Sequence, residues 1–312
     1  MMPTVLVTPR SLSLGRHPAI DRLVDNGFEI RCPTPGAVPS QEALLEALPG
    51  CDAWIAGIEP VSEEVIAAAD RLKVVSRNGS GIDNLPVATL EARGIAVRRA
   101  VGANARGVSE LALALTLAGL RHIVWTHEGM RQGEWPRRMG REIKGSRIGV
   151  VGLGAIGVDY AEACLGLGAN VLGYDPFAPD NRIKHERFRR VPLEELVSDV
   201  DAISLHAPMP EDGKPLLTAD RLSMLREGAV IVNTARAGLL DQQALLAGLE
   251  NGQIACYATD VFEVEPPAMS PVLAHPNTML TSHIGGFTGP SVERAAVQAV
   301  DNMLEVLATH AG

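Results

Sequence analysis

The sequence predicts an α/β protein made of two domains, each built around a doubly wound parallel sheet. With 312 residues, of which 46% are hydrophobic, the chain exceeds a typical single domain, so two separate cores are expected. Short apolar runs alternate with helix-like segments along its length, as in sheets whose parallel strands are joined by helices. Aromatic residues make up only 4%, and the aliphatic bias suits strands buried on both faces.

The N-terminal part contains five apolar runs separated by helical segments. We expect strands at 4–7, 29–30, 53–55, 73–76 and 95–97, with helices at 19–25, 41–48, 63–69 and 85–92. No glycine-rich phosphate loop occurs here, so this part is assigned to substrate rather than to a dinucleotide. The segment from Ser291 to Leu307 has apolar residues at helical spacing and is expected to return to this domain, which then spans 1–100 and 288–312.

The segment 146–175 organises the second domain, which we expect over residues 101–287. Its first apolar run is followed by Gly152, Gly154 and Gly157 in the pattern G-x-G-x-x-G. The first glycine allows a tight turn, the second lets a pyrophosphate approach, and the third lets the next helix pack against the strand. That helix then presents unpaired N–H groups to the phosphates. Glycine turns of this kind also occur for packing alone, so the pattern by itself is weak.

A second strand, at 170–174, strengthens the prediction of a Rossmann dinucleotide site. It is followed by Asp175, whose carboxylate can accept hydrogen bonds from the ribose hydroxyls of the adenosine half. This negative charge would repel a 2′-phosphate, and Pro176 and Phe177 supply no arginine in its place, so NAD is expected rather than NADP. Later segments, up to 278–280, complete an expected six-stranded sheet.

The segment 104–123 is expected to be a helix that links the two domains. It is apolar nearly all round, as in a helix buried between two bodies. A further helical stretch at 128–134 leads to Trp135 and then to the nucleotide unit. We expect a homodimer to form through the region of the first of these helices.

Charge and composition exclude several classes of protein. The formal net charge of -9 and the pI near 5.4 argue against a nucleic-acid partner, so the basic run Arg187, Arg189 and Arg190 is interpreted as solvated surface. The four cysteines stand far apart without a C-x-x-C pair, which predicts neither a metal site nor disulfides. No apolar run reaches the roughly eighteen residues of a membrane span, and the N-terminus lacks a signal-peptide pattern. We therefore expect a cytoplasmic protein.

Three polar residues follow later strands, at the edge where an open α/β sheet places its ligand-handling side chains. Arg236 would hold a substrate carboxylate and polarise a keto oxygen with paired donors. His283 would exchange the hydroxyl proton, and a Glu265 carboxylate within about 4–6 Å would favour the charged imidazole. Together they suffice for reversible oxidation of a hydroxy acid. Taken singly, each has a structural explanation: a helix cap, a solvated loop residue and a loop histidine.

The chain as a whole resembles the D-isomer-specific 2-hydroxyacid dehydrogenase family. Six motifs carry the likeness, in family order and at family spacing: RNGSGIDN at 77–84, NARGVSELALALTLA at 104–118, VGLGAIG at 151–157, NTARAGLLD at 233–241, DVFEVEP at 260–266 and SHIGGFT at 282–288. The resemblance implies a flavodoxin-like substrate domain and a Rossmann NAD-binding domain that close on the substrate. It also implies that Arg236, Glu265 and His283 are the catalytic trio.

The resemblance further implies which residues bind substrate and cofactor. Backbone N–H groups of the loop Asn78, Gly79, Ser80 and Gly81 would grip the substrate carboxylate, and Asp260 would hydrogen-bond the nicotinamide amide. The other cofactor contacts, besides the three glycines, would come from Ala155, Ile156, Asp175, Ala207, Thr234 and Ala235.

Within the family, the pattern looks closest to the 3-phosphoglycerate dehydrogenases. Their arginine before the glycine loop, here Arg77, helps to hold the phosphate, and Arg137 or Arg138 could reach the substrate from the partner subunit. Both arginines would suit a doubly charged substrate. The sequence ends at Gly312, so we expect no regulatory domain.

Two alternatives remain open. After the strand at 53–55, the phosphoglycerate enzymes carry an arginine, whereas this chain has Ala56, Gly57 and the acidic Glu59, which favours a glyoxylate or hydroxypyruvate reductase. The resemblance also extends to NAD-sensing corepressors, which use this fold to bind partner peptides. The negative charge of the chain favours the enzyme.

Overall fold

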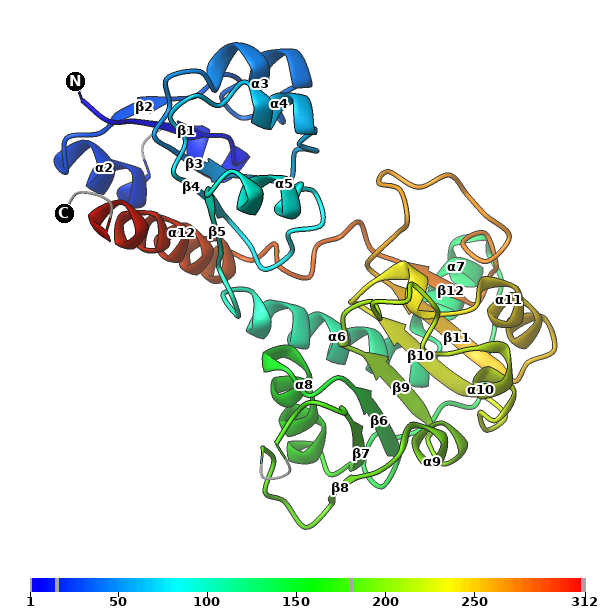
Figure 1. Ribbon diagram of the computed structural model, residues 1–312. Coiled ribbons are helices and arrows are strands. Elements are labelled where there is room, and N and C mark those ends of the chain that lie inside the picture. The colour runs from blue at the N-terminus through cyan, green and yellow to red at the C-terminus, as the bar shows by residue number, and fades with distance from the viewer. Residues whose placement is uncertain (1, 15–16, 180–181, 310–312) are drawn as a thin grey trace. The chain divides into compact units, whose positions relative to one another are not determined.

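The computed structural model describes residues 2–14, 17–179 and 182–309, which form two compact units (Figure 1). Unit 1 comprises the chain up to Asn104 together with the chain from Thr288 onward, and unit 2 comprises Ala105–Phe287. Each unit is built around one sheet in which every strand pairing is parallel. The prediction of an α/β protein with two parallel sheets is therefore confirmed.

Unit 1 contains a five-stranded sheet in the flavodoxin-like order β2-β1-β3-β4-β5. Side chains alternate across the sheet, so Leu6 packs in one core with α3, α4 and α5, while Val5 and Val7 pack in another with α2 and α12. Because helices cover both faces, the inner strands β1 and β3 are buried along their whole length, whereas the edge strands β2 and β5 carry exposed charged residues. The strands are β1 (Thr4–Val7), β2 (Glu29–Arg31), β3 (Ala53–Ala56), β4 (Val74–Arg77) and β5 (Ala96–Arg99), and the helices are α1 (Arg10–Ser13), α2 (Pro18–Asp25), α3 (Gln41–Ala47), α4 (Glu63–Ala67), α5 (Val87–Ala92) and α12 (Gly289–Thr309).

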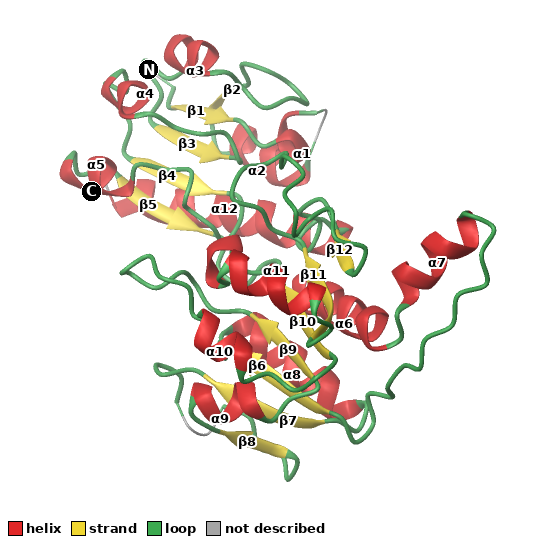
Figure 2. Ribbon diagram, turned by 90° about the vertical axis from the view of Figure 1, so that its right-hand side faces the viewer, coloured by secondary structure: helices red, strands yellow, loops and turns green. Residues whose placement is uncertain are grey.

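Unit 2 contains a seven-stranded sheet in the order β12-β11-β10-β9-β6-β7-β8. Helices α9, α10 and α11 cover one face, and α6 and α8 cover the other (Figure 2). The strand order reverses between β6 and β9, which is the point where such sheets bind ligands. The strands are β6 (Arg147–Val151), β7 (Asn170–Tyr174), β8 (Phe188–Arg190), β9 (Ala202–Leu205), β10 (Ala229–Asn233), β11 (Ile254–Thr259) and β12 (Thr278–Leu280), and the helices are α6 (Ala105–Leu120), α7 (Ile123–Arg131), α8 (Ala155–Gly166), α9 (Leu193–Ser198), α10 (Ala219–Ser223), the 3₁₀ turn η1 (Ala237–Leu239) and α11 (Gln242–Glu250).

The sheet of unit 2 has seven strands rather than the expected six, because the basic run forms an edge strand. β8 pairs with β7, and Arg190 turns inward to donate to the carbonyl oxygens of Asp175 and Ala178. Arg187 donates to the carbonyl oxygen of Leu165 at 3.0 Å. The prediction of a solvated surface therefore holds only for Arg189, which is exposed.

Two boundaries also differ from expectation. The helix expected to run to residue 123 ends at Leu120, because His122 adopts a left-handed conformation (φ 53°) and α7 starts after it. The chain passes from unit 1 to unit 2 after Asn104 rather than after residue 100, because Ala103 packs against Ala295 and accepts a hydrogen bond from Arg294 at 2.9 Å.

Among the described residues, no single helix is long and apolar enough to cross a membrane. Helices α6 and α7 would together have the required length and apolar composition, but they are bent by 65° relative to each other.

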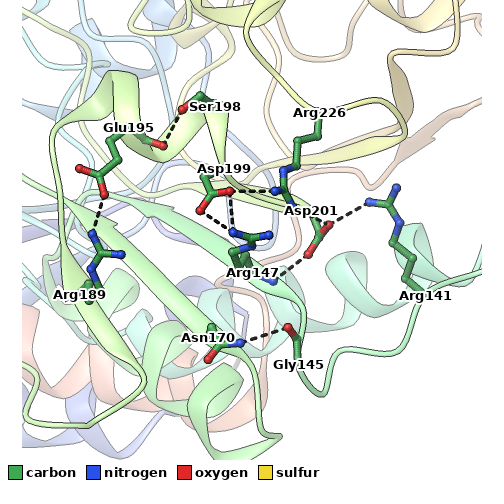
Figure 3. Close-up of polar contacts among 10 residues, drawn as sticks. All are labelled: Arg141, Gly145, Arg147, Asn170, Arg189, Glu195, Ser198, Asp199, Asp201 and Arg226. Atoms are coloured by element: carbon green, nitrogen blue, oxygen red, sulfur yellow. Dashed lines mark hydrogen bonds and ion pairs between the residues drawn. The ribbon is translucent and has the colours of Figure 1, made fainter.

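A network of ion pairs closes the amino edge of the unit 2 sheet (Figure 3). Arg147, the first residue of β6, contacts Asp199 at 2.6 Å and donates its backbone N–H to Asp201 at 2.8 Å. Arg226 contacts Asp199 at 2.9 Å, and Arg141 contacts Asp201 at 3.2 Å. These charges lie at the ends where the strands begin, so the carboxyl edge is left for ligands.

Candidate active site

The structure places Arg236, Glu265 and His283 beyond the carboxyl ends of three neighbouring strands. Arg236 follows β10, Glu265 follows β11 and His283 follows β12, and β11 pairs in parallel with both of the others. Parallel pairing therefore brings the three residues to one edge of the sheet.

His283 and Glu265 form a direct pair at this edge. Nδ1 of the imidazole lies 2.8 Å from Oε1 and 2.9 Å from Oε2 of the carboxylate. Because Nδ1 faces the carboxylate, Nε2 is the ring atom left to exchange a proton with a substrate. The backbone of His283 is left-handed (φ 55°), which is uncommon outside glycine and is a form of strain that clusters at functional sites.

Asp260 holds the loop that carries His283. It is 2% exposed, and its Oδ1 accepts from the Thr281 hydroxyl at 2.7 Å and from the Ile284 N–H at 2.8 Å. Its Oδ2 accepts from the Gly285 N–H at 2.8 Å. These donors come before and after His283 in the chain, so the carboxylate holds the backbone of the loop that carries the histidine. The expected contact with the nicotinamide amide stays a prediction; the positioning role was not foreseen.

The turn before Arg236 is clamped by Asn233, a residue that the sequence analysis did not single out. Asn233 is fully buried; its Oδ1 accepts from the Ala235 N–H at 3.0 Å and its Nδ2 donates to the Arg236 carbonyl at 2.8 Å. The Arg236 guanidinium donates to the Ala235 carbonyl at 2.7 Å. The available signal was an amide side chain at the end of an otherwise apolar strand.

The glycine turn after β6 has the geometry that a dinucleotide site needs. Gly152 has φ 93°, and a Cβ there would lie 2.6 Å from the backbone nitrogen of Ala207; a Cβ on Gly157 would lie 1.9 Å from the Gly152 oxygen. A Cβ on Gly154 would meet nothing within 4 Å, so this side of the turn is open. No side chain caps the N-terminus of α8, which starts at Ala155, and its first N–H groups can therefore face an anion.

The other expected cofactor residues lie beyond the carboxyl ends of strands of the same sheet. The Asp175 carboxylate, just beyond β7, accepts from the Leu153 N–H at 2.8 Å and from the Phe177 N–H at 2.9 Å. The Thr234 hydroxyl, just beyond β10, is sealed from solvent and has no hydrogen-bond partner among the described residues. Ile156 lies in the first turn of α8, while Ala207 and Ala235 follow β9 and β10. The open glycine face, the carboxylate beside it and the unsatisfied hydroxyl fit a dinucleotide.

His206 supports the glycine turn from the β9 side and was also missed. Its Nε2 lies 2.9 Å from the Ser204 hydroxyl, and its ring packs on Tyr160 with centroids 5.0 Å apart. Burial lowers the pKa of His206 to about 3, so the ring is neutral near pH 7. Its carbonyl oxygen would lie 2.8 Å from a Cβ on Gly152, which shows how closely the two backbones approach.

The loop expected to hold the substrate carboxylate lies at the carboxyl edge of the unit 1 sheet, directly after β4. Two of its N–H groups are already used: that of Asn78 donates to Ala56, and that of Gly79 donates to Arg77, both at 2.9 Å. The Ser80 hydroxyl lies 3.0 Å from the Ala100 carbonyl, so it ties the loop to its own unit. The N–H groups of Ser80 and Gly81 are therefore the better candidates for gripping a carboxylate.

Arg138 is anchored away from His283 within its own chain. Its guanidinium lies 4.0 Å from the centre of the Trp125 ring and donates to Asn277 at 2.9 Å. Asn277 immediately precedes β12, whereas His283 lies beyond the other end of that strand. The structure thus does not bring Arg138 to the histidine of the same chain. Among the described residues, no cluster of His, Cys, Asp and Glu could hold a metal ion.

Comparisons with known proteins agree with this site. The profile of the D-isomer specific 2-hydroxyacid dehydrogenase family, NAD binding domain, matches residues 113–285. D-3-phosphoglycerate dehydrogenase of Archaeoglobus fulgidus is 35% identical over 86% of this chain, which spans only 51% of that protein's length. Hydroxypyruvate reductase of Thermotoga maritima is 32% identical over 86% of this chain and 88% of its own. The solved structure of the TT0316 protein from Thermus thermophilus matches with a TM-score of 0.85 and 32% identity, covering 98% of this chain and 97% of that one.

Proposed function

Because the chain belongs to the D-isomer-specific 2-hydroxyacid dehydrogenase family, whose members oxidise the CH–OH group of 2-hydroxy acids with NAD(P), we propose that it is an NAD-dependent enzyme interconverting a 2-keto acid and a D-2-hydroxy acid. The observation that carries the proposal is the contact of 2.8 Å between His283 and Glu265, on a loop fixed by Asp260.

During reduction, His283 donates a proton from Nε2 to the keto oxygen as the carbonyl carbon is reduced. Glu265 stabilises the positively charged imidazole before that transfer and orients the ring through Nδ1. Arg236 binds the substrate carboxylate and polarises the keto oxygen with its paired donors. The nicotinamide, when bound, supplies the hydride for reduction and takes it up in oxidation.

Asp175 supports NAD rather than NADP as the cofactor. Its carboxylate stands 2.8 Å from the backbone nitrogen of Leu153, at the place where the adenosine ribose of a Rossmann cofactor binds. A 2′-phosphate there would meet this negative charge. Arg190 is close by, but its guanidinium is engaged with the backbone oxygens of Asp175 and Ala178.

Exposed apolar side chains on α7 and the loop after it support a homodimer, with an interface that lies after the helix region expected from the sequence. This segment stands out from the body of unit 2 (Figure 2). Trp135 is 79% exposed and Met139 96%, and Ile123 and Met130 are also exposed. Burying such side chains favours self-association. Sedimentation velocity should show a dimer that Trp135→Glu combined with Met139→Glu dissociates, whereas Val24→Glu on unit 1 leaves it intact.

Two substrate classes have an observation in their favour. Arg77, at the carboxyl edge of unit 1, favours 3-phosphoglycerate and its keto acid, a reaction named for the Archaeoglobus relative. The buried carboxyl of Glu59 at the same edge favours an unphosphorylated acid, such as the one named for the Thermotoga relative.

The experiment that tests the proposed function is the rate of NADH consumption with glyoxylate, hydroxypyruvate, 2-oxoglutarate and 3-phosphohydroxypyruvate at equal concentration. At least one should turn over, and the reverse reaction should use a D- but not an L-hydroxy acid. If purified, folded protein that binds NADH turned over none of them, a binding protein would be the better description.

A further inference from the structure

Glu59 is a buried carboxyl at the substrate edge of unit 1. It follows β3 in the loop at the carboxyl edge of the sheet and is only 1% exposed. Its Oε1 hydrogen-bonds the Thr8 hydroxyl and accepts from the Gly57 N–H at 2.8 Å. Thr8 follows β1 and also accepts from the Trp54 indole at 3.0 Å, so the carboxyl belongs to a network joining two strand ends.

The loop around Glu59 is locked in place. Asn84 donates to the backbone oxygens of Gly57 at 3.2 Å and of Glu59 at 2.7 Å. Glu59 also fills the space that a side chain at position 57 would need, because a Cβ there would lie 2.6 Å from its Oε2 and 3.2 Å from the Cα of Pro9. A lysine or arginine at position 57 is therefore incompatible with Glu59 as it is held here.

Arg77 is a half-buried cation at this edge. It ends β4, which pairs with β3, and its Nη1 donates to the Asn78 carbonyl at 2.5 Å. Burial lowers the pKa of Arg77, while the charges of Glu59 and Asp83 act on it in the opposite direction. The guanidinium thus has two acidic neighbours on its own unit. A phosphate carries about −1.5 to −2 charges near pH 7 and needs surplus positive charge, and these two acidic groups reduce the positive charge that Arg77 can offer it.

We propose that Glu59 makes this site selective for 2-keto acids that carry no second anionic group, such as glyoxylate, pyruvate or hydroxypyruvate, by balancing the charge of Arg77. This inference rests on the proposed dehydrogenase function and decides between its two substrate classes. Glu59 does not contact the substrate, because it is buried; it is a positioning residue that acts through Arg77 and through the space it fills.

The test compares kcat/KM for hydroxypyruvate and 3-phosphohydroxypyruvate in the wild type and in Glu59→Gln. The wild type should prefer hydroxypyruvate by at least about tenfold. Glutamine keeps the shape and hydrogen bonds but removes the charge, so the variant should narrow that preference by about tenfold, mainly through a lower KM for the phosphorylated acid. The matched control is Glu91→Gln, which removes an exposed carboxylate of unit 1 and should leave the ratio unchanged.

Each outcome separates the two proposals. If the wild type preferred the phosphorylated acid, this inference would fail while the dehydrogenase function stood, and that result needs no variant to fold. A folded Glu59→Gln with the wild-type ratio would also overturn it, because the charge would then have no influence. Absence of turnover with both keto acids would instead count against the proposed function.

Discussion

The buried carboxylate of Asp260 accepts a hydrogen bond from the backbone N–H of Gly285 at 2.8 Å, and this contact ties the loop that carries His283 to the end of β11. A Cβ on Gly285 would lie 3.0 Å from the same oxygen, so the approach depends on glycine. His283 stands two residues earlier, with a strained left-handed backbone that the loop has to hold. Asp260 therefore keeps the imidazole in register with Glu265.

Asp260→Asn should damage both stability and turnover. The amide offers one acceptor oxygen in place of two, and its NH₂ group would face a buried N–H donor. A buried unsatisfied group costs about 1–3 kcal/mol, which urea unfolding would measure. Turnover should fall by about tenfold as the histidine loop loosens. The exposed Glu162→Gln is the control, and wild-type turnover in Asp260→Asn would mean that the loop holds without this carboxylate.

His283→Ala should lower turnover by on the order of a hundredfold or more, because the proton donor is lost, while NADH affinity stays nearly unchanged. Glu265→Gln should lower it by about tenfold. Since the two residues act as one unit, the double variant should be no slower than His283→Ala alone. Single-turnover rates and NADH fluorescence titrations provide the measurements. Additive losses would show that Glu265 acts independently of the imidazole.

Asp175→Asn should shift cofactor use toward NADPH by about tenfold in kcat/KM, because an acceptor remains while the charge that repels a 2′-phosphate is removed. Asp175→Ala should weaken NADH binding as well, since the turn also loses the contacts to Leu153 and Phe177. Steady-state kinetics with both cofactors distinguish the two effects. An unchanged NADPH to NADH ratio in both variants would place the ribose contact elsewhere.

Glu59→Gln should gain stability relative to the wild type as the pH rises. Burial raises the pKa of the Glu59 carboxyl above the value of about 4.3 in an unfolded chain, so the folded state holds this proton more tightly. The associated stability is present at low pH and is lost as pH rises from the unfolded to the folded pKa, at up to about 1.4 kcal/mol per pH unit. Glu59→Gln has no titrating carboxyl at this position, so its stability does not fall with pH for this reason. Urea midpoints from pH 4 to 8 provide the measurement, and parallel curves for the two proteins would contradict it.

Much of the fold was readable from the sequence because its signals are local. An apolar run followed by glycines predicts β6 and its turn, and alternating runs and helices predict two parallel sheets. Parallel topology then explains why Arg236, Glu265 and His283 share an edge, since each follows a strand. The edge strand β8 was missed because its three residues, Phe188–Arg190, are partly polar and carry no apolar pattern.

The sequence by itself determined the fold class, the glycine turn and which polar residues follow the later strands, because each depends on a pattern within a few neighbouring residues. Only the tertiary structure decided which side chains meet across the chain: Asp260 with the loop 24–25 residues later, and Glu59 with Thr8, 51 residues earlier. The reason is physical. Burial and hydrogen bonding of a carboxyl depend on which strand ends lie next to one another, and no short segment of the sequence determines the strand order.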